Sequence, residues 1–162
     1  MTEFRLFGQK LYLSPILDLY SGDIVTYTLS DSPNLLTVTT MLEQAFAKIP
    51  DKTNLLLHSD QGWYYRNKRY VQMLQDKGIQ QSMSHKDNCY DNVVMENFFG
   101  HLKSKLLYLQ EFKSIEHFKQ ELIESTNYYN KRIKARLKGL PPALYRQQAL
   151  LAAKIIWVKI FV

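Results

Sequence analysis

One stretch of the chain constrains the fold most, because it joins a buried strand to a long amphipathic helix and places one acidic residue on each. The apolar run Leu55–Leu57 predicts a short buried strand, and Asp60 follows at its end, where Gln61-Gly62 breaks the pattern. The second acid, Glu96, lies among apolar residues spaced by three and four, which indicates a helix with one buried face. These residues are Val94, Met95, Phe98, Phe99, Leu102 and Leu106. Such a combination is typical of folds with packed α and β layers.

The helix that contains Glu96 has a face suited to an anionic substrate. Glu96, Gly100 and Lys103 follow one another at i, i+4 and i+7, so they share one face. Two acids from different elements can hold Mg²⁺, which prefers oxygen ligands, and paired metals stabilise both oxygens of a phosphoryl displacement. The alternative is that Asp60 is a turn residue and Glu96 a solvated surface charge.

The spacing and flanking sequence of the two acids resemble a known family. The 35 residues 61–95 separate Asp60 from Glu96. The flanking segments His58–Gly62 and Asn88–Asn92 are similar to those of insertion-sequence transposases with a retroviral-integrase-like core. Members of that family have a catalytic triad of two aspartates and a glutamate, with a gap of 35 residues before the glutamate.

The resemblance extends from about Thr2 to Arg146 and implies a ribonuclease H-like fold. It matches Asp60 to the second aspartate and Glu96 to the glutamate, so both are expected to be catalytic metal ligands. It matches Lys103 to a basic residue that approaches DNA in related integrases. The resemblance also implies Mg²⁺ or Mn²⁺ as cofactor, with two ions in the intact family.

The family's first aspartate has no counterpart in the printed sequence. It belongs to a segment Asp-x-Thr, and Thr2 aligns with that threonine, so the aspartate would fall just before Met1. We therefore expect the catalytic activity of the chain as encoded to be lower by orders of magnitude, so that it is in effect inactive. Asp18, in an expected strand, and Asp23, in an expected turn, are candidate replacements for the missing acid.

Two functions are therefore compatible with the sequence. The first is a metal-dependent polynucleotidyl transferase that nicks transposon ends and joins the freed 3′-hydroxyl to target DNA. The second is a catalytically dead remnant that binds DNA, or that pairs with an intact transposase and inhibits it. The expected partners are transposon-end and target DNA, with a second copy of the chain or an intact transposase.

Charge and composition agree with a nucleic-acid partner. A net charge of +6 and a pI of about 9.3 favour a polyanion. The single cysteine, Cys89, excludes an internal disulfide and is compatible with the cytosol. The start of the chain does not resemble a signal peptide, and no run approaches the roughly 18 apolar residues that span a bilayer. A bacterial cytoplasmic protein at the nucleoid is expected.

Cations gather in one segment. Residues 131–138, the basic segment, contain Lys131, Arg132, Lys134, Arg136 and Lys138. Five cations in eight residues can neutralise several phosphates and give salt-dependent affinity for DNA. A solvated surface loop is the alternative. The polar stretch Ser84–Asp91 is interpreted as a mobile loop over the site, in which Lys86 would approach DNA.

The aromatic segment Trp63–Arg66 has two interpretations. Its alternation of aromatic and basic groups is typical of a base-stacking surface. Packing of Trp63 into the core at the corner between strand and helix is the favoured interpretation.

The complete pattern predicts a mixed five-stranded sheet flanked by helices, with a C-terminal helical extension. The expected strands cover 4–7, 11–19, 24–29, 55–59 and 79–83, and the expected helices cover 35–48, 66–77, the Glu96 segment and 114–129. We divide the chain into a catalytic core (1–110), its helical extension (111–150) and an apolar tail (151–162). The tail is β-prone, resembles nothing in the family and is interpreted as an aggregation liability produced by out-of-frame translation.

Overall fold

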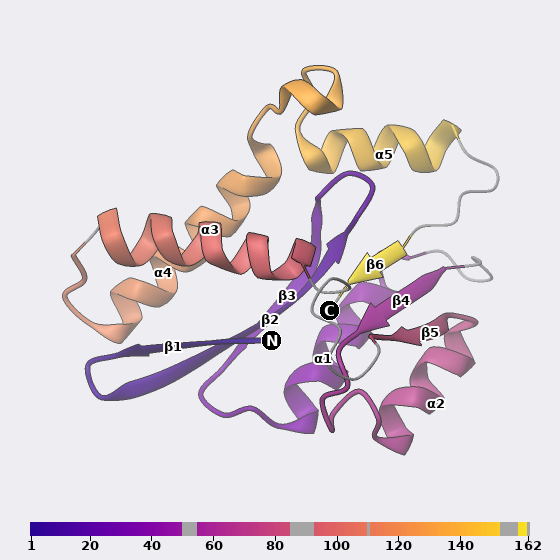
Figure 1. The fold of residues 1–162 in the computed structure, drawn as a ribbon, viewed down its shortest axis with the longest axis horizontal. Helices are drawn as coiled ribbons and strands as arrows, with labels where there is room; N and C mark the ends of the chain where they lie inside the picture. Colours follow the sequence, from indigo (N-terminus) through magenta and orange to yellow (C-terminus); the bar gives the residue numbers. More distant parts are fainter. Residues whose placement is uncertain (50–54, 85–92, 110, 153–158, 162) are drawn as a thin grey trace.

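A mixed sheet of six strands organises the molecule (Figure 1). The structure, a computed structural model, describes residues 1–49, 55–84, 93–109, 111–152 and 159–161. The strand order is β1-β2-β6-β4-β5, and β3 pairs with β2 outside this path. The sequence predicted five of these strands. The sixth, β6 (Lys159–Phe161), comes from the apolar tail and lies between β2 and β4.

The first three strands form an antiparallel meander, as predicted. They are β1 (Thr2–Leu6), β2 (Gln9–Asp18) and β3 (Ile24–Ser30). The β1–β2 connection is a two-residue turn in which Phe7 and Gly8 both have positive φ, at 54° and 71°. Such a turn matches the twist of a hairpin, and it sets the register of β1 on β2.

The next two helices start and end at recognisable caps. Helix α1 (Leu35–Phe46) starts at Asn34, whose side chain accepts the backbone N–H of Thr37. Helix α2 (Lys68–Lys77) ends at Gly78, where a φ of 75° closes the helix in the left-handed region. Both helices were predicted, with boundaries that differ by two residues at one end.

The parallel part of the sheet places the first predicted acid. Strands β4 (Leu56–Ser59) and β5 (Gln80–Met83) pair in parallel, and α2 makes the connection between them. The carboxyl end of β4 therefore faces the same edge of the sheet as the end of β5. Asp60 is the first residue beyond β4.

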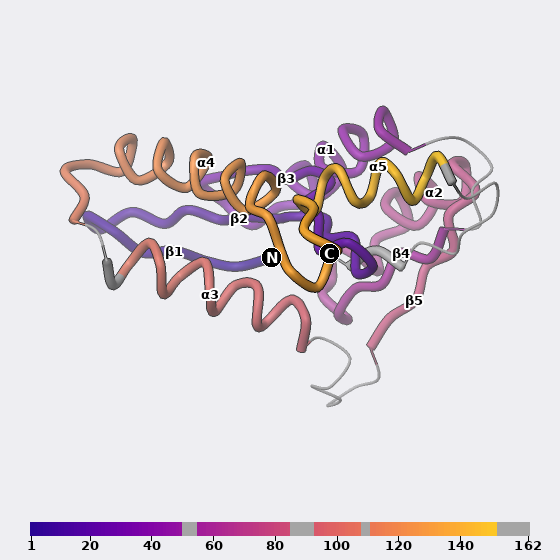
Figure 2. The backbone as a smooth tube through the Cα atoms, turned by 90° about the horizontal axis from the view of Figure 1, so that it is seen from above, coloured from indigo at the N-terminus to yellow at the C-terminus, as the bar shows by residue number. Residues whose placement is uncertain are grey.

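The remaining helices cover the meander. They are α3 (Val93–Leu109), α4 (Ile115–Lys131) and α5 (Pro142–Ala152), with a short 3₁₀ turn at Ala135–Leu137. Ser114 caps α4 as predicted, because its side chain accepts the N–H of His117. Figure 2 shows α3 and α4 both running alongside the β1–β2 hairpin, and residues of both helices pack in one cluster with it.

The core has two clusters, one on each side of β2. The first joins α1, α2 and β4 and includes Ile16, Val38, Leu42, Leu57, Tyr65 and Tyr70. The second joins α3 and α4 to the meander and includes Phe4, Leu13, Leu17, Met95, Phe98, Leu102, Phe118 and Leu122. Ile16 of β2 belongs to the first cluster and its neighbour Leu17 to the second, since neighbouring side chains of a strand point to opposite faces.

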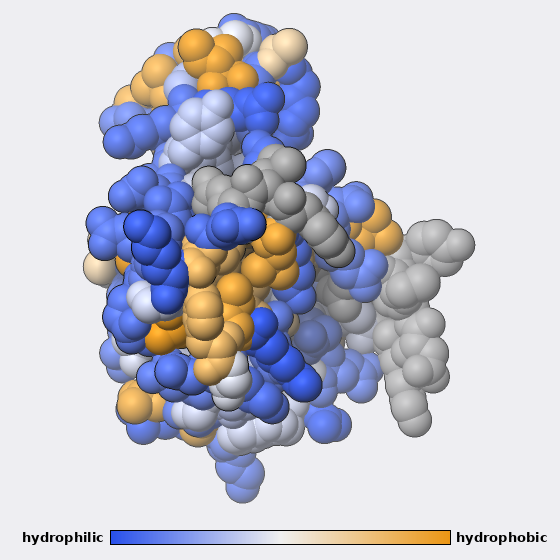
Figure 3. Space-filling view, turned by 90° about the vertical axis from the view of Figure 1, so that its left-hand side faces the viewer, coloured by the Kyte–Doolittle hydropathy of each residue, from blue (hydrophilic) through white to orange (hydrophobic). Residues whose placement is uncertain are grey.

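The end of the molecule that contains the β1–β2 turn has a mostly hydrophilic surface around an apolar area (Figure 3). None of the helices in the described ranges is both long and apolar enough to span a bilayer.

Candidate active site

Asp60 is presented to solvent at the end of a buried strand. Leu57, His58 and Ser59 are buried, and Asp60 is exposed. Its Oδ1 accepts the backbone N–H of Gly62 at 2.7 Å. A Cβ on Gly62 would lie 2.8 Å from that same oxygen. The glycine therefore allows the close approach that holds the carboxylate in place.

The end of β4 is tied to the neighbouring strand by side chains. His58 lies between two hydroxyls, with Nδ1 3.0 Å from Ser82 Oγ and Nε2 3.0 Å from Ser84 Oγ. The Gln61 amide donates to the Ser84 carbonyl at 3.0 Å. These contacts fix the backbone on both sides of Asp60.

Two buried tyrosines lie under this end of the strand. The rings of Tyr65 and Tyr70 meet edge to face at 5.4 Å. Burial raises the pKa of the Tyr65 hydroxyl, and the negative charge of Asp60 acts in the same direction. The buried Tyr65 and Tyr70 therefore pack near Asp60 as uncharged side chains.

The amino group of Met1 lies close enough to Asp60 to interact with its charge. Desolvation lowers the pKa of this amino group, and the carboxylate of Asp60 acts in the opposite direction. A residue placed immediately before Met1 would be attached at this amino group, on which the charge of Asp60 acts. That is the position to which the Asp-x-Thr pattern assigns an aspartate.

Glu96 lies in the first turn of α3, where a negative charge complements the helix dipole. It is exposed, whereas Met95 and Phe98 beside it are buried in the second core cluster. In Figure 1 the start of α3 and the end of β4 both lie towards the middle of the view, near the N-terminus. Asp60 and Glu96 are called the acidic edge below.

Lys103, the third residue of the predicted helix face, is half-buried. Its ammonium lies 5.6 Å from the centre of the Phe4 ring on β1. A contact of this kind holds the cation against the sheet by attraction to the ring.

Asp18 and Asp23 take part in a local structure instead of a cluster with Asp60. Asp18 accepts the N–H of Tyr20 at 2.9 Å and the hydroxyl of Ser21 at 2.8 Å. Arg146 of α5 faces both acids, with Nε 3.5 Å from Asp18 and Nη1 4.0 Å from Asp23. Burial raises the pKa of Asp23. Both carboxylates are thus engaged in joining the β2–β3 turn to α5.

The donor set of the acidic edge suits a hard divalent cation. Mg²⁺ is usually bound by one or two carboxylates together with water and substrate phosphates, and Asp60 and Glu96 provide two exposed carboxylates. Within the described ranges, no three side chains of the His, Cys, Asp or Glu type gather closely enough to hold a metal ion by themselves.

A second region of interest is a cavity of about 840 Å³ between α3, α4 and the basic segment. It is called the basic pocket. Its lining comprises Phe98, His101, Leu102, Lys105, Ser125, Tyr128, Tyr129, Arg132, Ile133, Lys134, Ala135 and Arg136. Among the residues that the structure describes, this lining contains no acid, and it contains three of the five cations of the basic segment. Lys131 and Lys138 are exposed and lie outside it.

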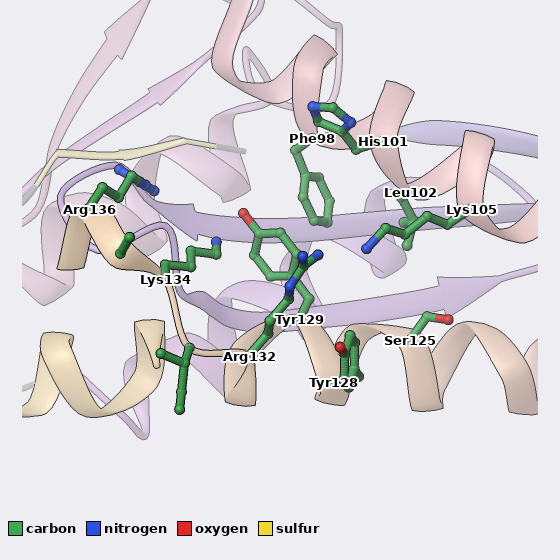
Figure 4. Close-up of a pocket in the computed structure, with 12 residues that line it drawn as sticks. Phe98, His101, Leu102, Lys105, Ser125, Tyr128, Tyr129, Arg132, Lys134 and Arg136 are labelled. Atoms are coloured by element: carbon green, nitrogen blue, oxygen red, sulfur yellow. The ribbon is translucent and has the colours of Figure 1, made fainter. Parts of the chain in front are cut away.

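Aromatic rings hold the cations of the basic pocket. Lys134 Nζ lies 3.8 Å from the centre of the Tyr129 ring, and Lys105 Nζ lies 6.0 Å from that of Tyr128. Figure 4 shows Phe98 from α3 and Tyr129 from α4 approaching one another at the back of the pocket, and their rings meet at 5.3 Å. Cations and aromatic faces at this spacing suit a phosphate with a stacked base.

The pKa of Lys134 is lowered to about 8. Burial is the main cause, followed by the positive charges of Arg136 and Arg132. An anion bound in the pocket would raise the pKa of Lys134 by attraction to its charge. The excess of positive charge therefore favours the binding of an anion.

Asn130 was not recognised as an anchor from the sequence. Its side chain accepts the N–H of Ile24 and donates to the carbonyl of the same residue, both at 2.8 Å. This pair of bonds joins the end of α4 to the start of β3.

One expectation in this region was wrong, and one lies outside the described residues. Trp63 is 53% exposed and contacts the ring of Tyr64 at 4.3 Å, so it does not pack in the core. Tyr65 takes the buried place instead, because the turn after Asp60 points the third aromatic inward. The loop with Lys86 and Cys89 lies outside the described residues.

The mixed sheet with flanking helices places Asp60 at the end of β4 and Glu96 at the start of α3. The profile of a family described as integrase core domain matches residues 1–89, and a second profile with the same description matches residues 96–150. The chain belongs to this family.

Relatives and solved structures agree with this assignment. The chain is 50% identical over 149 residues to a protein of Escherichia coli (strain K12) named as transposase InsK for insertion sequence element IS150, covering 91% of this chain and 53% of that protein. It is 46% identical over 151 residues to a transposase-like protein of Haemophilus influenzae, covering 93% of this chain and 69% of the relative. The chain thus spans about half the length of the Escherichia coli relative.

Among solved structures, the catalytic core of HTLV-2 integrase in complex with magnesium superimposes with a TM-score of 0.67 at 13% identity, covering 89% of this chain and 90% of that core. The catalytic core of BIV integrase superimposes with a TM-score of 0.63 at 18% identity, covering 94% of this chain and 95% of that one. The fold is therefore ribonuclease H-like, as predicted.

Proposed function

We propose that the acidic edge supports metal-dependent phosphoryl transfer on DNA, in which transposon ends are nicked and the freed 3′-hydroxyl is joined to a target strand. The observation that supports this most is the placement of Asp60. It is exposed at the end of a buried strand and held by the Gly62 N–H, in a chain of the integrase core domain family. Residues 1–110 would form the catalytic core, and the helices of 111–150 would provide part of the DNA contact.

Asp60 and Glu96 would hold Mg²⁺ or Mn²⁺ together with phosphate oxygens of the DNA. When bound, the metal activates the attacking oxygen and neutralises the departing one. A third carboxylate immediately before Met1 would complete the site, because the Met1 amino group already lies within the influence of Asp60. We propose that this third acid is required for activity.

The protein's own contribution is alignment. The Gly62 N–H holds one oxygen of Asp60, and the contacts of His58 with Ser82 and Ser84 keep the strand end in place. Preorganised charges of this kind need no rearrangement when the reaction takes place. Glu96 is positioned by a helix whose opposite face is packed in the core.

DNA is the proposed substrate and partner, in the cytoplasm at the nucleoid, with a second copy of the chain or an intact transposase as protein partner. Lys105, Arg132, Lys134 and Arg136 line a pocket to which the described part of the chain contributes no acid, and such a site would neutralise backbone phosphates. Lys103 would contact a phosphate nearer to the acidic edge. Lys86, Lys131 and Lys138 are proposed as further phosphate contacts.

The test is an assay of cleavage and joining of labelled transposon-end DNA with Mg²⁺ or Mn²⁺. It compares the parent chain with a chain carrying one aspartate immediately before Met1, called the Asp-extended chain, and with the Asp60→Asn variant of each. We expect joining by the Asp-extended chain alone. Joining by the parent chain that is lost in Asp60→Asn would show that another acid completes the site.

A catalytically inactive DNA-binding protein is the second candidate. It is favoured by the lack, within the described ranges, of three gathered metal-ligating side chains. It predicts that the parent chain binds transposon-end DNA, and inhibits an intact transposase, without cleaving. If the Asp-extended chain binds DNA and does not join it, this second function stands and the first is wrong.

A further inference from the structure

Strands β1 and β6 lie end to end along the same edge of β2. Strand β1 pairs with residues Gln9–Leu13 of β2, and β6 pairs with Leu17 and Asp18. Both are antiparallel to β2, so they run in the same direction. The other edge of β2 is occupied by β3, which pairs with Leu13 and Leu17 as well. The two strands therefore share one line through the sheet.

The register shows how closely β6 continues this line. Thr2 pairs with Leu13, and each step towards the start of the chain moves the partner one residue further along β2. By this count the position three residues upstream of Met1 would face Leu17. Phe161 pairs with Leu17. The tail strand thus lies where a strand continuing β1 upstream would run.

The second edge of β6 completes the sheet. Leu56, Leu57 and His58 of β4 pair in parallel with Lys159, Ile160 and Phe161. Among the described strands, β6 is the one that connects β4 and β5 to the meander. In Figure 1 it lies between β2 and β4, close to the first residue of the chain. Without a strand in this line, the edges of β2 and β4 would both lose backbone partners.

We propose that the space between β2 and β4 is a strand-docking track, that the tail strand Lys159–Phe161 occupies it within the same molecule, and that a strand continuing β1 upstream displaces it. Directional pairing with both neighbours provides the recognition, which is the mode by which extended peptides add to sheets. The occupant needs an extended backbone with free N–H and C=O groups on both edges.

The two possible occupants differ in the loop that each must close. The tail strand follows α5, which ends at Ala152, so its docking closes a loop. Closing this loop costs conformational entropy. An upstream strand is continuous with β1 and closes no loop. It also adds pairs beyond the three that β6 makes with β4. The upstream strand therefore binds more strongly than the tail.

Docking in this track also affects the acidic edge. Phe161 pairs with His58, which lies two residues before Asp60. A strand in the track supports the end of β4 from one side, while β5 supports it from the other. The inference rests on the strand pairing and not on the proposed phosphoryl transfer.

Amide hydrogen exchange of three chains tests the proposal. They are the parent, a chain with the β-prone extension Thr-Val-Thr-Val-Asp before Met1, and a matched chain with Gly-Pro-Gly-Pro-Asp at the same place. The Gly-Pro extension has the same length and final charge but lacks the propensity and the donors for pairing. We expect the β-prone extension to speed exchange in 159–161 by about tenfold or more, while His58, which faces the track, stays protected. The Gly-Pro extension should leave the tail as protected as in the parent.

The variant Ile160→Pro gives a second, independent readout. Leu55 and Ser59 bond to β5, so the alternate residue His58 faces β6. Proline removes a ladder donor, so the His58 amide should exchange faster in this variant, and the β-prone extension should restore its protection. Tail amides that stay protected in the presence of the β-prone extension, with the extension itself unprotected, would overturn the proposal. A further result would also overturn it: a molecular mass that doubles with rising protein concentration, together with stronger protection of the tail amides. That result would show that a second copy supplies the strand.

Discussion

The acidic edge and the basic pocket hold their charged side chains in different ways. Asp60 and Glu96 are exposed at the ends of regular elements, and the Asp60 carboxylate accepts the backbone N–H of Gly62. Lys134 is half-buried against the Tyr129 ring, and its pKa is lowered by burial and by neighbouring cations. The first arrangement presents carboxylate oxygens to solvent, and the second concentrates positive charge in a pocket. Under the proposed function, the acidic edge would serve chemistry and the basic pocket would serve binding.

The largest effect should come from the acids. In the Asp-extended chain we expect Asp60→Asn or Glu96→Gln to reduce the joining rate by on the order of 10² to 10³, because each removes charge that stabilises the transition state. The affinity for DNA should change little. Single-turnover rates at saturating protein, with fluorescence anisotropy for binding, measure the two quantities separately. A variant that weakens binding and leaves the saturating rate intact would break the comparison.

The basic pocket should respond in the opposite way. We expect the triple variant Arg132→Gln, Lys134→Gln, Arg136→Gln to weaken DNA binding by roughly 10- to 100-fold and to lower the salt slope of binding by about 3. The matched control is Lys131→Gln with Lys138→Gln, two cations of the same segment outside the pocket lining. Equal losses of affinity per charge in the two variants would show that the pocket has no special role.

The variant Gly62→Ala tests whether the position of the Asp60 carboxylate affects the joining rate separately from the affinity for DNA. The added Cβ would lie 2.8 Å from Asp60 Oδ1, so the carboxylate must move while the backbone remains in an allowed conformation. We expect the joining rate of the Asp-extended chain to fall by about tenfold, with unchanged DNA affinity and a melting temperature close to that of the parent. An unchanged rate would show that the position held by the Gly62 N–H is not the reactive one.

The smallest expected effect concerns Lys134 and the pH dependence of the free energy of unfolding. Its pKa of about 8 lies below the ordinary 10.5, so the unfolded chain binds more protons between these values. The contribution of Lys134 to the free energy of unfolding therefore rises with pH from about 8 to 10.5, and Lys134→Met should remove that rise. An NMR titration of the side chain should show the lowered pKa and an increase when DNA binds. A pKa near the ordinary value in the free protein would contradict the account of the pocket.

Much of the site could be predicted because its determinants are local. The apolar run before Asp60 specified a buried strand, and the spacing around Glu96 specified a helix with its opposite face in the core. The meander followed from turn signals at Gly8 and Gly22, where the φ of 71° at each favours glycine. Patterns of this kind can be read within a few residues of the element they determine.

Features that depend on distant partners could not be predicted in this way. The tail was recognised as β-prone, but its place between β2 and β4 depends on residues more than 100 positions away. The ring of Tyr129 beside Lys134 and the bonds of Asn130 to Ile24 likewise arise only when α4 reaches the sheet. Trp63 shows the same limit, because the direction of one turn decided which aromatic is buried.

The most direct test of the central claim is Mn²⁺ titration of the ¹⁵N-labelled Asp-extended chain, followed by paramagnetic broadening of its amide signals. If Asp60 and Glu96 share a metal site, the amides of residues 59–62 and 94–98 should broaden together at the same Mn²⁺ concentration. Asp60→Asn should then abolish the broadening at both segments. Broadening at one segment only, or broadening near Glu96 that survives Asp60→Asn, would contradict a shared metal site at the acidic edge.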